Sequence, residues 1–170
     1  MQPQGYPGSV EELATHDQLL SMSGLAFMQA MLRGELPLPP ISKTMGYRLD
    51  TVEDGHVIFR GTPEFPHLNP MRGVHGGWYG TLLDSAMACA VMTKLPQGAV
   101  YTTLEYKINI TRALPEGMEI LSKGVVSHAG WSSGVAEGTI RGAADGRLYA
   151  TGSTTCLIMN VCDAASSGLN

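Results

Sequence analysis

The stretch HLNPMRGVHGGWYGTLLDSAMACA, residues 67–90, carries the strongest signals in the chain for both fold and chemistry. It starts within a loop rich in proline and glycine (residues 62–77) and runs into apolar and small residues at 78–95. Alanine favours helix, so residues 78–95 are predicted to form one helix. This helix is apolar nearly all round, which is typical of a helix that other elements enclose.

Asp84 is the exception on this apolar helix. An ionised carboxylate removed from water is costly unless it is paired or hydrated, so its presence needs a reason. It follows Gly77 by seven residues, almost two turns, and therefore shares one helix face with Gly77, Thr81 and Ala88. Two interpretations stay open at this point. Asp84 is either a cap or buried hydrogen-bonding anchor, or a group that takes part in chemistry.

The glycines ahead of the helix point to a second feature. Gly76 and Gly77 leave the first N–H groups of the helix uncovered, and a helix start presents free donors and partial positive charge. Such donors can stabilise a carbonyl oxygen as negative charge develops on it. The alternative is an ordinary glycine-rich turn. Asn69 and His75 offer side-chain donors here, or serve only to shape the turn.

Periodic patterns predict the remaining elements. Apolar residues at helical intervals indicate a helix over 15–33, and Gly34 follows as a possible cap. Alternating patterns and turn signals indicate strands at 43–51, 56–62, 99–112, 118–128, 131–141 and 147–160. Within 99–112, even-numbered residues are expected to face one way and odd-numbered residues the other.

This order predicts an α+β fold, with an antiparallel curved sheet of about six strands around one central helix and an extra N-terminal helix. One domain is expected at 15–160, with its core at 43–160. A flexible arm is expected at 1–14 and a flexible tail at 161–170. Such a sheet has an open edge, and edge pairing commonly produces dimers.

Composition excludes several classes of protein. Hydrophobic residues make up 44% of the 170 residues and charged residues 15%, which is too apolar for a disordered chain. The net charge of -4 favours neither nucleic acid nor an anionic membrane as a partner. Three scattered cysteines argue against a disulfide framework or a zinc site and fit a cytoplasmic location. Neither a secretory signal nor a membrane-spanning run is expected.

Taken together, these residues resemble a known family. Asn69, Gly73, the run His75-Gly76-Gly77, and an acid nine residues after the histidine match the pattern of PaaI-like hotdog-fold acyl-CoA thioesterases, the phenylacetate-degradation type. The similarity continues through TTLEYKINITRALPEG at 102–117 and covers roughly residues 43–160.

The resemblance implies an acyl-CoA thioesterase that acts on an aromatic or medium-chain acyl group. It makes Asp84 the nucleophile or general base and the Gly76 N–H the oxyanion donor, while Asn69 and His75 orient the carbonyl or loop. Thr103 would help to hold the water, and Gly77 and Thr81 would contact substrate. No metal is implied, and no cofactor except the coenzyme A of the substrate. The expected assembly is a homodimer or homotetramer with a site shared between chains.

Two further residues are assigned to substrate binding. Arg112 is the candidate for a coenzyme A phosphate contact, against the alternative of an ordinary surface arginine. Trp131 would pack on the ligand, or else is an aromatic residue of the core or rim. The chain departs from the family pattern at both places: family members often carry a basic residue after Gly130, and Ala113 replaces a usual proline.

Other functions stay open. A hotdog dehydratase needs a histidine base with a carboxylic acid, which His75 and Asp84 could imitate. A non-catalytic acyl-CoA-binding or regulatory protein would keep the fold without turnover. Methionines of the N-terminal half, such as Met28 and Met31, are either core filler or the lining of an adaptable acyl pocket.

Overall fold

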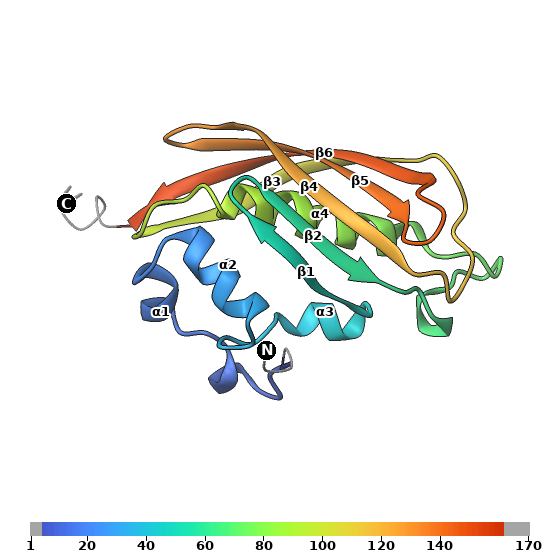
Figure 1. Ribbon diagram of the computed structural model, residues 1–170, viewed down its shortest axis with the longest axis horizontal. Coiled ribbons are helices and arrows are strands. Elements are labelled where there is room, and N and C mark those ends of the chain that lie inside the picture. Colours follow the sequence, from blue (N-terminus) through green and yellow to red (C-terminus); the bar gives the residue numbers. More distant parts are fainter. Residues whose placement is uncertain (1–4, 162–170) are drawn as a thin grey trace.

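Six antiparallel strands form one curved sheet in the computed structural model, which describes residues 5–161. The sheet order is β1-β2-β4-β5-β6-β3. The strands are β1 (Tyr47–Glu53), β2 (His56–Gly61), β3 (Ala99–Ile110), β4 (Ile120–Ala129), β5 (Ser133–Gly142) and β6 (Leu148–Asn160). Figure 1 shows the sheet arching over one long helix, α4 (Gly76–Met92). The predicted α+β architecture, a curved antiparallel sheet around a central helix, is confirmed.

Shorter helices precede and connect these elements: η1 (Val10–Glu12), α1 (His16–Leu20), α2 (Gly24–Leu32), α3 (Pro40–Thr44) and η2 (Phe65–His67). In Figure 1 they gather on the side of α4 that the sheet leaves uncovered. Within the part of the chain that the structure describes, no helix is both long and apolar enough to cross a membrane.

α4 is enclosed because its side chains are apolar or small. Trp78 and Leu82 are almost completely buried. Ser122 of β4 donates a hydrogen bond from its Oγ to the Leu82 carbonyl at 3.1 Å. Gly124 lets the β4 backbone touch the helix, since a Cβ at that position would collide with the Ala86 carbonyl oxygen. The helix is therefore fixed against the middle of the sheet.

The single helix predicted over 15–33 is wrong in one respect, because α1 and α2 are separate. Ser23 caps α2 by accepting a hydrogen bond at its Oγ from the Ala26 N–H at 3.3 Å. The Gly24 N–H donates to the Leu95 carbonyl at 3.0 Å. These bonds start a new helix at Gly24 and tie it to the end of α4.

The strand predicted at 43–51 starts later than expected. Pro40 occupies the first turn of α3, where its fixed backbone angle and missing N–H suit a helix start. α3 therefore takes the first residues of the predicted strand, and β1 begins at Tyr47. The other predicted strands and the central helix are present, with ends displaced by a few residues. The displacement at α4 matters most for the candidate site, because the helix begins at Gly76 and not at residue 78 as predicted.

The even alternation predicted for residues 99–112 is also wrong. Thr103 pairs with Cys156 of β6, and Glu105 pairs with Thr155, the neighbour of Cys156. Leu104 therefore has no partner of its own and is the extra residue of a β-bulge. Before the bulge, odd-numbered residues such as Tyr101 and Thr103 face α4. After it, even-numbered residues face α4, as the contact of Tyr106 with Gly80 shows.

The N-terminal segment that was expected to be an arm makes specific contacts from residue 5 onwards. The Gly5 carbonyl accepts a hydrogen bond from the Leu38 N–H at 2.9 Å. Tyr6 donates its hydroxyl to the Tyr47 carbonyl at 3.2 Å. Apart from Val161, the expected tail at 161–170 lies outside the described residues.

Candidate active site

Asp84 lies two turns into α4, on the side of the helix that faces β3. Thr103, just before the bulge, donates a hydrogen bond from its Oγ1 to Asp84 Oδ1 at 3.0 Å. Within residues 5–161 the second carboxylate oxygen has no hydrogen-bond partner, and no ion pair involves Asp84. One oxygen is thus held in place, while the other remains free to act on a water or a substrate.

Partial burial controls the acidity of Asp84. Burial raises the pKa of its carboxyl above the usual value, and the hydrogen bond from Thr103 opposes that rise. The Cys89 thiol and the Tyr101 hydroxyl lie close by. Burial raises the pKa of Cys89 to about 12, and the negative charge of Asp84 adds to the rise. Asp84 is therefore a carboxylate among neutral side chains. Its raised pKa makes it a stronger base than an exposed aspartate.

The start of α4 offers a free backbone donor. His75 caps the helix, and its Nδ1 accepts a hydrogen bond from the Gly77 N–H at 2.9 Å. The Trp78 N–H donates to the His75 carbonyl at 3.0 Å. The N–H of Gly76, the residue between His75 and Gly77, has no hydrogen-bond partner among the described residues. It stands at the positive end of a 17-residue helix, where a negatively charged oxygen is stabilised.

Asn69 organises the loop that leads into α4. Its Oδ1 accepts hydrogen bonds from the Met71 N–H at 2.9 Å and from the Gly73 N–H at 3.1 Å. The backbone of Asn69 closes the same loop, with its N–H donating to the Gly73 carbonyl at 2.8 Å. The side chain thus sets the direction from which the chain enters the helix at Gly76.

Two clefts flank this helix start. One, of about 370 Å³, is lined in part by His75, Gly77 and Thr81. The other, of about 340 Å³, is lined in part by Asn69 and Arg112. Three of the predicted contact residues, Gly77, Thr81 and Arg112, are therefore near the start of α4, but they are divided between its two sides.

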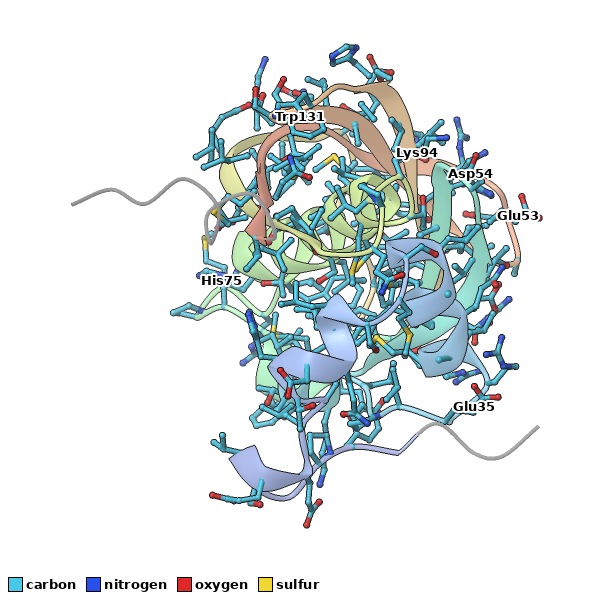
Figure 2. All side chains as sticks on the ribbon, turned by 90° about the vertical axis from the view of Figure 1, so that its left-hand side faces the viewer. Glu35, Glu53, Asp54, His75, Lys94 and Trp131 are labelled. Atoms are coloured by element: carbon cyan, nitrogen blue, oxygen red, sulfur yellow. The ribbon has the colours of Figure 1, made fainter. Side chains whose placement is uncertain are left out.

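Trp131 lies elsewhere. It is 73% exposed at the turn before β5, and its carbonyl accepts a hydrogen bond from Asn160 at the end of β6. Asn160 pairs with Ala99, the first residue of β3, whereas Gly76 lies beside Ile110, the last residue of β3. The eleven steps from Ala99 to Ile110 correspond to about 36 Å along the strand. In Figure 2, Trp131 lies at the top of the molecule and His75 at its left side, and the two side chains do not meet.

Asp84 and Gly76 are also separated within one chain. Eight residues of α-helix correspond to about 12 Å along the axis. A carbonyl group in contact with both would span only about 7 Å: a hydrogen bond of about 2.9 Å, the carbonyl bond of about 1.2 Å and an attack distance of about 3 Å. One chain therefore cannot bring both groups to the same carbonyl.

The prediction from sequence missed several features around Asp84. The bulge at Leu104 decides which side chains of β3 face the helix, and no residue type in that strand predicts a bulge there. Tyr101 and Cys89 were not singled out, although their position next to an isolated acid on the same two elements was a usable signal.

Comparisons with known proteins bear on the fold and on the superfamily. Residues 72–149 match the family model of the thioesterase superfamily. No curated protein matches the chain. Among solved structures, a phenylacetic acid degradation-related protein from Ralstonia eutropha JMP134 is 28% identical with a TM-score of 0.70, over 77% of this chain and 98% of that one. A thioesterase family protein from Silicibacter pomeroyi is 26% identical with a TM-score of 0.66, over 71% and 90%. The PaaI protein of E. coli shares the fold at 22% identity and a TM-score of 0.69, over 82% and 96%.

Asp84→Asn is expected to raise stability against urea at neutral pH. The folded-state pKa of Asp84 is raised, so the carboxylate destabilises the folded protein increasingly as pH rises from the unfolded value, about 3.9, through the folded value. Asparagine is uncharged, and its oxygen can still accept from Thr103. The gain in urea midpoint should be largest at neutral pH and shrink toward about pH 4.

Asp54→Asn is the matched control, because Asp54 is exposed and pairs with Lys94 at 2.7 Å. This variant should show no such gain. An Asp84→Asn protein that is no more stable than wild type at neutral pH would contradict the expectation.

Proposed function

We propose that this chain is a PaaI-like thioesterase of the hotdog fold and that it hydrolyses acyl-coenzyme A thioesters to free acid and coenzyme A with Asp84 in the chemical step. The superfamily match supports thioester hydrolysis in general. The choice of Asp84 depends on one observation: a half-buried carboxylate has one oxygen held by Thr103 and the other free. No metal and no cofactor beyond the coenzyme A of the substrate enters the proposal.

Two routes use the same carboxylate. As a general base, Asp84 takes a proton from a water whose oxygen attacks the carbonyl carbon, and the coenzyme A sulfur then leaves and accepts a proton. As a nucleophile, Asp84 attacks the carbon itself, the C–S bond breaks, and the coenzyme A thiolate leaves and accepts a proton; water then cleaves the resulting anhydride to the free acid and restores the Asp84 carboxylate. A single turnover in water enriched in heavy oxygen separates the routes, because only the nucleophilic route can place label in Asp84.

Gly76 supplies the complementary group. As the carbonyl carbon becomes tetrahedral, its oxygen gains negative charge. A preorganised N–H at a helix start stabilises that charge without reorganisation during the reaction. The unpaired Gly76 N–H fits this role, while His75 and Asn69 hold the helix start and the loop in position.

Because one chain cannot bring Asp84 and Gly76 to the same carbonyl, we propose that two copies complete each site. Gly80 lies halfway between them on α4 and touches the ring of Tyr106, near the middle of β3. A two-fold axis passing here, with β3 of each copy antiparallel to the other, brings Asp84 of one chain opposite Gly76 of the second.

The surface of β3 supports this assembly. β3 is an edge strand of the sheet. It exposes three large hydrophobic side chains, those of Leu104, Tyr106 and Ile110. So many exposed hydrophobic side chains are unusual on an edge strand that has no partner. Pairing with a second copy would satisfy the edge hydrogen bonds and cover these side chains. Association of two such dimers into a tetramer remains compatible with this arrangement.

The substrate contacts follow from the clefts at the start of α4. Gly77 and Thr81 line one of them and would contact the substrate near the carbonyl. Arg112 lines the other, beside Asn69, and would pair with a phosphate of coenzyme A. Trp131 would serve the ligand only if the substrate extended to the far end of the sheet.

The function is tested with a panel of aromatic and aliphatic acyl-CoA thioesters, with thiol release followed by a thiol reagent. Wild type should release coenzyme A, and Asp84→Asn should lower kcat about 10²–10⁴-fold, the usual effect of a general acid or base. Binding without thiol release would identify an acyl-CoA-binding protein instead. Near-wild-type turnover by Asp84→Asn would reject the role of Asp84.

Gly76→Pro tests the backbone donor directly, because proline lacks the N–H. Proline is favoured at the first helical position, and His75 already has the extended backbone that a following proline requires. The variant should fold and lose about 10²–10³-fold in kcat, the effect of removing one oxyanion donor. Gly76→Ala is the matched control, since it keeps the N–H and its Cβ meets only Ile110 at an ordinary 3.6 Å. Equal losses in both variants would show that the N–H is not the donor.

Mixing chains tests the shared site. Asp84→Asn and Gly76→Pro chains, each inactive alone, should regain activity when they are unfolded together and refolded in equal amounts. Random pairing makes half the dimers mixed, and each mixed dimer has one site with neither change, so about a quarter of wild-type activity should return. A mixture as inactive as its components would contradict a site built from two chains.

A further inference from the structure

An apolar pocket of about 390 Å³, open on one side to solvent, lies between the N-terminal helices and the core. Its volume falls within the range of about 300–1,000 Å³ that is usual for ligand sites. One wall comes from α1 and α2 and the other from α4 and β3, with lining residues that include Leu19, Phe27, Met28, Met31, Cys89 and Tyr101. None of its lining residues is charged.

Two residues of the pocket wall lie between it and the candidate active site. Tyr101 is on the same face of β3 as Thr103, which holds Asp84. Cys89 follows Asp84 by five residues, about 7.5 Å along α4, and the charge of Asp84 acts on both Cys89 and Tyr101. The pocket therefore lies one layer of side chains from the acid, toward the far end of the helix.

The polar side chains of this pocket, Tyr101 and Cys89, are neutral, because burial raises the pKa of each. A ligand that enters thus meets no charged group. Met28 and Met31 line the opposite wall, and methionine adapts to flexible apolar ligands because it is unbranched and has three rotatable bonds.

From this geometry we infer that the pocket receives the acyl chain of the substrate, and that this chain is an unbranched aliphatic one. The inference rests on the proposed function. The walls from α1 and α2 lie outside residues 72–149, the part that matches the superfamily model, so this preference belongs to the N-terminal segment of this chain.

The test uses S-alkyl coenzyme A thioethers of two to ten carbons, which bind but cannot be hydrolysed, with affinity measured by calorimetry. Each added methylene that enters the pocket should tighten binding about fourfold, until the pocket is full. Ala14→Phe places a large side chain in the pocket wall and should abolish the increase for longer chains while leaving the ethyl thioether unaffected. Val10→Phe is the matched control, because Val10 is 77% exposed in the same segment and does not line the pocket.

Met31→Ala provides a second variant if Ala14→Phe proves unstable. It enlarges the pocket, so the increase in affinity should continue to longer chains than in wild type. Affinity that is independent of chain length in wild type, stronger binding of an aromatic thioether, or equal effects of Ala14→Phe and Val10→Phe would overturn the inference.

The outcome separates this inference from the proposed hydrolysis. If no acyl-CoA is hydrolysed but binding tightens with chain length and Ala14→Phe removes the increase, the pocket assignment stands and the enzymatic proposal fails. If the wild type hydrolyses thioesters with no dependence on chain length, the enzymatic proposal stands and the pocket assignment fails.

Discussion

Close contact between α4 and the middle of the sheet is the constraint on which the remaining structure depends. Gly124 and Gly138, on β4 and β5, bring those strands against the helix, since any side chain there would collide with it. Tyr101 and Tyr106 of β3 are large by contrast. The helix therefore packs closely against the backbones of β4 and β5 and through large side chains against β3, and the side that faces β3 carries Asp84.

Placing chemistry on a buried helix has advantages and a penalty. A helix held by packing keeps its functional groups in fixed geometry better than a loop does. Burial also makes the Asp84 carboxylate more basic, while the loop ordered by Asn69 leaves the Gly76 N–H unpaired. Each of these features reduces stability locally, which is common at functional sites. The packing of the rest of α4 offsets that loss.

The sequence was sufficient for the order of the strands, the enclosed helix and the isolated acid Asp84 on it, because these depend on local periodicity and on one isolated charge. Other features depend on partners that are distant in sequence. The break before Gly24 requires the Leu95 carbonyl, and the bulge at Leu104 is defined only by its pairing with β6. Trp131 could be assigned to a ligand from its residue type alone, whereas its distance from His75 needed the fold. The apolar pocket likewise arises only when α1 and α2 lie against α4.

The bulge at Leu104 has an effect beyond the orientation of Thr103. An edge strand with a regular repeat can slide along a partner or recruit further strands without limit. A single inserted residue breaks that repeat, because odd-numbered residues of β3 face the helix before Leu104 and even-numbered residues face it afterwards. In the proposed dimer, this irregularity would favour one register between the two β3 strands over all others.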